Sequence, residues 1–232
     1  MRKTLSEISS NALSIFRTNW SRRRGHVAPD SESVQLGNDA VELEAAVLYA
    51  DLAASTSLVS RYKDYFAAEV VKSFLLAACD VIRNNDGDIV SFDGDRVMAV
   101  FVGGRKCTNA AKAGLQIASA IREVNKQHSS VYNKTNYIID YAVGIDVSDL
   151  FVIRTGIRGS NDLSWIGSAA NIAAKLSEIR ERSEKVFVTE HVYNRMGDSS
   201  KYGGKGNSCM WRQMSLKVNG NTIYGSDWYW NF

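Results

Sequence analysis

The chain reads DIVSFDGDRVMAVF from residue 88 to residue 101. Within this stretch, apolar runs at 88–92 and 96–101 flank Asp93-Gly94-Asp95, and an Asp-Gly pair between such runs is a strong signal for a β-hairpin. An earlier apolar run, residues 45–50, has the continuous character of a central strand that is buried on both faces. These three runs predict the strands around which the rest of the chain folds.

Helical periodicity fills the intervals between the predicted strands. Residues 57–84 and 108–126 are predicted helices, and a further strand is predicted at 137–147. The resulting order, βαββαβ, is that of the ferredoxin-like α+β fold, in which the first and third strands are antiparallel neighbours at the centre of the sheet. The end of the first strand, at Asp51, is therefore expected beside the beginning of the third, at Asp95.

The remaining residues form an arm before this core and a smaller group of elements after it. Residues 4–20 have the apolar spacing of one amphipathic helix that packs on another surface, and residues 21–40 have the irregular composition of a linker. We therefore divide the chain into a helical arm with its linker, residues 1–43, and a main domain, residues 44–232. After the core we expect a strand at 151–155, a helix at 167–182, a strand at 186–189 and a C-terminal hairpin that ends in Trp228-Tyr229-Trp230.

The composition limits the class of protein. The 28 basic and 25 acidic residues give a net charge of +3, which is too balanced to indicate a nucleic-acid-binding surface. The cysteines lie far apart without CxxC spacing, which indicates neither a zinc site nor a disulfide framework, and the histidines are scattered. No run of about 18 apolar residues is present, and the first residues lack the apolar stretch of a signal peptide. We expect a cytoplasmic protein with no membrane span.

Two aspartates that meet at a strand end and a hairpin turn offer hard oxygen ligands, which suit Mg²⁺ or Mn²⁺ bound together with substrate phosphates. Singly, Asp51 could be a helix N-cap and Asp95 a turn residue, which is the role we assign to Asp93. The expected convergence of the first two favours a metal site. Small residues up to Ser55 and Thr56 lead from Asp51 into a helix, whose first N–H groups could hold a triphosphate.

Three motifs carry a resemblance to a known family. Residues 47–56, VLYADLAAST, have an aromatic residue two places before an Asp and a Thr five places after it. Residues 93–101, DGDRVMAVF, contain a Gly-Asp hairpin, and residues 165–175, WIGSAANIAAK, have a Gly followed four places later by Asn. Over roughly residues 45–195, these motifs resemble the class III nucleotide cyclases, whose helix motif also has an Arg eight places after the Gly.

The resemblance implies a role for each matching residue. Asp51 and Asp95 would bind two divalent cations, Mn²⁺ or Mg²⁺, helped by the main-chain carbonyl of Leu52. Asn171 would orient the ribose, and Lys175, one helical turn further on, would stabilise charge on the transferring phosphate. In the family these two groups reach the metals from the other subunit. The resemblance therefore implies a head-to-tail homodimer with two shared sites, and an inactive monomer.

Lys175 departs from the arginine of the family. An ammonium group cannot form the planar bidentate contact of a guanidinium, so either the lysine suffices or Arg154 or Arg158 assists it. An ordinary exposed helix lysine is the alternative interpretation of Lys175, and a buried polar cap is the alternative for Asn171.

The positions that select the base point away from purines. Family members that use ATP present Lys and Asp where this chain has Ser91 and Ser164, and members that select guanine present Glu and Cys. Two small hydroxyl residues, with Tyr49 adding a polar group, fit a smaller base or one held through water. The strand around Tyr49 and the arm motifs at 20–25 and 36–38 resemble the bacterial pyrimidine cyclases of Pycsar antiphage defence.

That closer resemblance implies that UTP is converted to 3′,5′-cyclic UMP and that a separate effector protein responds to the product. A serine hydroxyl can serve uracil or cytosine, so the residues alone leave the two pyrimidines open. Cytidylate or adenylate cyclases of the same fold are alternatives, as is a catalytically silent nucleotide-binding module. The presence of Asp51, Asp95 and Asn171 argues against silence, whereas Lys175 and the base positions argue for it. A dinucleotide cyclase would need a GGDEF-type hairpin, which is absent at 92–97.

Overall fold

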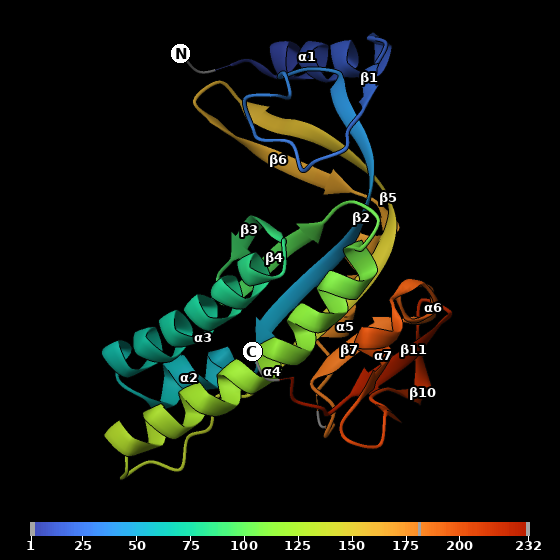
Figure 1. The fold of residues 1–232 in the computed structure, drawn as a ribbon. Helices are drawn as coiled ribbons and strands as arrows, with labels where there is room; N and C mark the ends of the chain where they lie inside the picture. Colours follow the sequence, from blue (N-terminus) through green and yellow to red (C-terminus); the bar gives the residue numbers. More distant parts are fainter. Residues whose placement is uncertain (1–2, 181, 231–232) are drawn as a thin grey trace.

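The computed structural model describes residues 3–180 and 182–230 (Figure 1). Its helices are α1 (Leu5–Arg17), α2 (Ser55–Arg61), α3 (Asp64–Asn84), α4 (Lys106–Val131), α5 (Ser168–Ser177), α6 (Glu190–Arg195) and α7 (Asp198–Lys201). Its strands are β1 (Ser21–Arg24), β2 (Asp39–Leu52), β3 (Asp88–Asp93), β4 (Arg96–Phe101), β5 (Tyr141–Ile157), β6 (Ser160–Ile166), β7 (Val186–Thr189), β8 (Tyr202–Gly203), β9 (Ser208–Cys209), β10 (Arg212–Val218) and β11 (Asn221–Ser226). The ends of the predicted domain ranges, residues 1–2 and 231–232, and position 181 of the predicted helix lie outside the described residues.

One large sheet organises the molecule. Its strands run in the order β10-β11-β7-β5-β2-β4-β3, with β1 added to β2 and β6 added to β5, while β8 and β9 form a separate pair. β2 lies between β4 and β5 and is antiparallel to both. The predicted α+β fold is confirmed, since β2, α3, β3, β4, α4 and β5 follow one another in the predicted order and the first and third core strands are neighbours.

β2 is buried on both faces because successive side chains of a strand point to opposite sides. Ala46, Leu48 and Ala50 pack in the core beneath α3 and α4, which lie side by side across one face of the sheet (Figure 1). Ala45 and Val47 pack on the other face, in a cluster that includes alanines of α5. Asp51 continues the second series, so its side chain belongs to the α5 face of the sheet.

Close packing of α5 on the sheet depends on a glycine in β5. A Cβ atom at Gly144 would overlap the carbonyl oxygen of Ala173 and come 2.5 Å from the Cβ of Leu176. Only glycine leaves room for the helix backbone at this place. The position of α5 over the sheet is therefore set by Gly144.

Three predicted elements of the core differ from the structure, and the helix predicted at 167–182 ends at Ser177. The helix predicted at 57–84 is broken at Tyr62, whose backbone is extended (φ −121°, ψ 163°), because the chain turns there to stack the Tyr62 ring on Phe66 with a centroid distance of 4.6 Å. The strands predicted at 137–147 and 151–155 merge into one strand, β5, which begins only at Tyr141. β6 pairs back on it as a long ribbon that was not predicted. The strand predicted at 186–189 is confirmed as β7.

The arm contains the predicted helix and an unpredicted strand. Thr4 and Glu7 form a capping box at the start of α1, yet no residue of this helix is buried, and Leu5 and Phe16 are 83% and 84% exposed. Residues 21–24, predicted as linker, form β1 by pairing in parallel with the beginning of β2. The division of the chain at residue 43 stays a prediction.

The C-terminal hairpin is present as β10 and β11, and the aromatic residues predicted at its end follow it. Trp228 and Trp230 pack against the core beneath α3 and α4. Among the described helices, none is both long and apolar enough to cross a lipid bilayer.

Candidate active site

Asp51 and Asp95 meet as the sequence predicted. Asp51 lies directly opposite Arg96 in the β2–β4 pair, and Asp95 precedes Arg96 in the β3–β4 turn. Burial raises the pKa of Asp51, and the negative charge of Asp95 adds to that rise. Two carboxylates that are 44 positions apart in the chain therefore lie at one end of the sheet.

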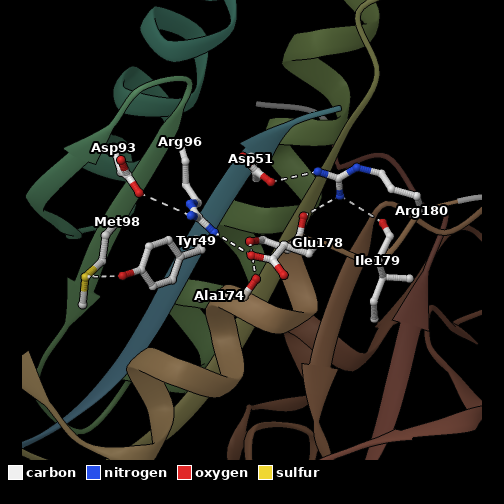
Figure 2. A network of polar contacts seen from close by, with 10 residues as sticks. Tyr49, Asp51, Asp93, Arg96, Met98, Ala174, Glu178, Ile179 and Arg180 are labelled. Atoms are coloured by element: carbon white, nitrogen blue, oxygen red, sulfur yellow. Dashed lines mark hydrogen bonds and ion pairs between the residues drawn. The ribbon is translucent and has the colours of Figure 1, made fainter. Parts of the chain in front are cut away.

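Asp51 is a largely buried carboxylate with one cationic partner. Its side chain is 14% exposed, and its Oδ2 accepts a hydrogen bond of 2.8 Å from Nη2 of Arg180 (Figure 2). Burial raises the pKa of Asp51 above its ordinary value, while the charges of Arg180 and Arg96 lower it. The site thus holds a carboxylate that needs nearby positive charge.

Among the described residues, Asp95 has no such partner. Its Oδ2 is buried and accepts no hydrogen bond from the described residues. A buried carboxylate oxygen without a donor is costly, and a divalent cation would satisfy it. Within the described part of the chain, no group of three or more His, Cys, Asp or Glu residues could hold a metal. The two aspartates would therefore share a metal with substrate phosphates and water, as expected for Mg²⁺ or Mn²⁺.

Arg96 connects the end of the sheet that carries the two aspartates to the neighbouring residues. Its Nη1 donates to Glu178 Oε1 at 3.0 Å and its Nη2 to Asp93 Oδ2 at 3.4 Å (Figure 2). Asp93 is thus an ion-pair partner as well as a turn residue. The guanidinium carbon of Arg96 lies 5.6 Å from the ring centroid of Tyr49, whose hydroxyl contacts the sulfur of Met98 at 3.0 Å.

The three predicted base-contacting residues fall into two groups. Ser91 and Tyr49 both pair with Met98, one from β3 and the other from β2, so the three side chains form a row on one face of the sheet. Ser164 belongs to the β5–β6 ribbon, where its hydroxyl is 2.8 Å from that of Thr155. The structure therefore groups Ser91 with Tyr49, and it gives Ser164 a partner on its own ribbon.

Asn171 and Lys175 are exposed on α5, one turn apart. Lys175 donates to Asn219 Oδ1 at 3.0 Å, in the turn between β10 and β11. Among the described residues, neither Asn171 nor Lys175 has a hydrogen bond or ion pair with Asp51. Arg154, considered above as an aid to Lys175, donates instead to Asn161 at 2.7 Å within the β5–β6 ribbon.

Leu52, Ser55 and Thr56 surround the entry into α2. Leu52 is buried at the end of β2, whereas Thr56 is exposed. Ala54 precedes α2 in the left-handed conformation (φ 57°), and no side chain caps the helix. Within the described residues, the start of α2 thus has no side-chain cap, and the role of its first N–H groups in holding a triphosphate stays a prediction.

Sequence reasoning missed Arg96, Glu178, Arg180 and Asn219. The pairing of Asp51 with Arg96 could have been inferred from the predicted antiparallel neighbours, since Arg96 follows Asp95 directly. Arg180 and Glu178 lie just after α5, in a region predicted only as helix, and no local pattern relates them to Asp51 or Arg96.

Known proteins resemble this chain in sequence and in fold. No family model matches the chain. It is 39% identical to a uridylate cyclase of Xanthomonas perforans, over 97% of this chain and 96% of the relative, and 41% identical to a uridylate cyclase of Burkholderia cepacia, over 93% of each. A bacterial light-regulated adenylyl cyclase superimposes with a TM-score of 0.69 at 16% identity, covering 81% of this chain and 52% of that one. The adenylyl cyclase CyaB from P. aeruginosa gives 0.68 at 18% identity, covering 81% and 95%.

The fold and the relatives define a class III nucleotide cyclase, which confirms the resemblance carried by the sequence motifs. Within that class, the chain belongs to the uridylate cyclase family.

Proposed function

We propose that this cyclase converts UTP to 3′,5′-cyclic UMP and pyrophosphate in the cytoplasm, as the second-messenger synthase of an antiphage defence system with a separate effector. The meeting of Asp51 and Asp95, with a buried Asp95 oxygen that lacks a donor, carries the proposal of phosphoryl-transfer chemistry. Relatives that are 37–41% identical and are named uridylate cyclases support the choice of base.

Asp51 and Asp95, with the main-chain carbonyl of Leu52, would hold two divalent cations, Mg²⁺ or Mn²⁺. Bound there, the cations would favour ionisation of the ribose 3′-hydroxyl and neutralise charge on the triphosphate. The 3′-oxygen would attack the α-phosphorus, its proton would pass to solvent water, and the bond from that phosphorus to the oxygen bridging to the β-phosphate would break. Pyrophosphate takes the electron pair of that bond as it leaves. The N–H groups at Ser55 and Thr56 would bind triphosphate oxygens, which the lack of a side-chain cap on Ala54 supports.

Asn171 and Lys175 would complete the site from a second copy of the chain. Their exposure on α5 supports this arrangement, in which Lys175 would exchange its hydrogen bond to Asn219 for contacts with the bound nucleotide. In such a homodimer Asn171 orients the ribose and Lys175 stabilises negative charge on the transferring phosphate. Each of the two sites then takes its aspartates from one copy and its α5 groups from the other.

The row formed by Ser91, Met98 and Tyr49 supports a small base. Hydroxyl groups on both sides of a thioether can donate to or accept from the edge of a pyrimidine. Ser164, the third predicted base contact, would approach from the β5–β6 ribbon. Because a hydroxyl can serve uracil or cytosine, CTP is the second candidate substrate.

The test is to incubate the purified protein with Mn²⁺ and ATP, GTP, CTP or UTP separately, and to identify products by chromatography and mass spectrometry. We expect 3′,5′-cyclic UMP as the dominant product. Dominant cyclic CMP would retain the reaction but contradict the assignment of the base. The absence of any cyclic product from a folded dimer would overturn the proposed function.

A further inference from the structure

The metal-binding carboxylate already holds a cation that belongs to the chain. Arg180 Nη2 lies 2.8 Å from Asp51 Oδ2, and the two side chains are only 30% and 14% exposed. An ion pair at this distance is a full charge-assisted hydrogen bond. A divalent cation on Asp51 would repel the guanidinium, so the metal and Arg180 compete for the same carboxylate.

Arg180 has a second set of partners that does not involve Asp51. Its Nη1 donates to the main-chain oxygen of Ser177 at 2.5 Å and to that of Ile179 at 3.1 Å (Figure 2). Ser177 is the last residue of α5 and Ile179 follows it closely, so both carbonyls lie by the helix C-terminus, where the helix dipole favours a positive charge. A guanidinium displaced from Asp51 would therefore keep a favourable position beside its own helix.

The end of α5 is tied to the sheet by a different ion pair. Glu178 accepts from Arg96 at 3.0 Å, and Arg96 begins β4. This contact does not involve the side chain of Arg180. The exchange of Arg180 for a metal would therefore leave this ion pair between the end of α5 and the sheet available.

We propose that Arg180 is a displaceable cation on Asp51, which pairs with this carboxylate in the metal-free enzyme and is exchanged for a divalent cation when the site fills. It thereby raises the metal concentration at which the enzyme becomes competent. The inference rests on the proposed metal role of Asp51. It gives Arg180 the role of a competitor for the Asp51 carboxylate and not that of a residue that touches substrate.

The test is Mn²⁺ binding to the protein without nucleotide, at pH 8, followed by the EPR signal of free Mn²⁺. Loss of the competing cation in Arg180→Gln should tighten Mn²⁺ binding roughly three- to tenfold, the range expected for the removal of one partly buried ion pair. Arg182→Gln is the matched control, since it removes the same charge from an exposed side chain two positions away. The Mn²⁺ affinity of Arg182→Gln should equal that of the wild type. Arg180→Lys, which keeps the charge, should also bind Mn²⁺ with nearly the wild-type affinity.

Asp51→Asn tests whether the effect passes through this carboxylate. In that background, Arg180→Gln should leave Mn²⁺ affinity unchanged. The proposal is overturned if Arg180→Gln, in the otherwise native chain, binds Mn²⁺ as tightly as the wild type or more weakly. If Asp95→Ala still lowers the Mn²⁺ affinity in that case, the metal site itself stands. Absence of Mn²⁺ binding that depends on Asp95, in both wild type and Arg180→Gln, overturns the proposal together with the metal assignment. Thermal unfolding of each variant checks that it is folded.

Discussion

Asp95 has a buried carboxylate oxygen that accepts no hydrogen bond from the described residues. This side chain is therefore expected to matter for function more than for the stability of the fold. A residue that is retained for folding would be expected to make hydrogen bonds. The Oδ2 atom of Asp95 makes none with the described residues. Its neighbour Asp51 accepts a hydrogen bond from Arg180. The two aspartates of the site are therefore predicted to respond differently to substitution.

We predict that Asp95→Asn lowers the rate of cyclic nucleotide formation by on the order of 100-fold or more, because the carboxylate charge is needed for metal binding. The melting temperature should stay level or rise, since no described hydrogen bond to Oδ2 is lost. Product formation and thermal unfolding are measured on the same preparation. A variant with unchanged turnover would remove Asp95 from the proposed site.

At the scale of elements, Glu44 of β2 joins three parts of the fold. It accepts from Arg195 of α6 at 2.5 Å and pairs with Lys106, the first residue of α4, at 2.8 Å. These two hydrogen bonds lower the pKa of Glu44 to about 2 from its ordinary value of 4.5. Because the folded-state pKa is depressed, its stabilising contribution is present above pH 4.5 and is lost as pH falls toward 2.

The prediction is that Glu44→Gln lowers the melting temperature at pH 6 and that the difference from wild type shrinks as pH falls below 4.5. The effect is modest because Glu44 is 38% exposed and solvent screens the pairs. Melting curves from pH 3 to pH 7 test it. A difference that is constant with pH would show that the Glu44 charge is not its cause.

Gly144 fixes α5 on the sheet, and α5 carries Asn171 and Lys175. We predict that Gly144→Ala destabilises the fold by about 1–3 kcal/mol, as overpacking does, and reduces turnover further because it shifts α5. Gly104→Ala is the control, since a Cβ atom there meets nothing within 4 Å. Denaturant unfolding and assays of product formation on both variants test this prediction. Equal free energies of unfolding for the two variants would mean that α5 can move to make room for the added Cβ atom without loss of stability.

The elements that could be predicted from sequence are those with local signals. The Asp-Gly turn and the flanking apolar runs predicted β3, β4 and the position of Asp95. β1 could not be predicted, because Arg22-Arg23-Arg24 has no strand pattern and becomes a strand only by pairing with β2. The ion pair between Asp51 and Arg180 spans 129 positions and depends on where α5 ends, which no short pattern encodes.

At the scale of the whole molecule, the proposed site is divided between two copies. Asp51 lies at the end of β2, while Asn171 is exposed on α5 without a described hydrogen bond or ion pair to it. Mixing refolded Asp51→Ala and Asn171→Ala chains should therefore restore activity, because each mixed dimer has one site with both groups intact. Random pairing predicts about a quarter of the wild-type rate per chain. Verified mixed dimers without activity would contradict the shared sites.

The arm joins the same sheet, since β1 pairs with the first residues of β2 and Asp51 lies near the other end of that strand. β2 is matched residue by residue to β5 from Ala40 to Leu52. A slip of one residue would turn Asp51 toward the core beneath α3 and α4 and bring an apolar side chain to the site. During evolution, β2 should therefore accept substitutions but neither insertions nor deletions, and differences in length among relatives should gather in the turns that surround it.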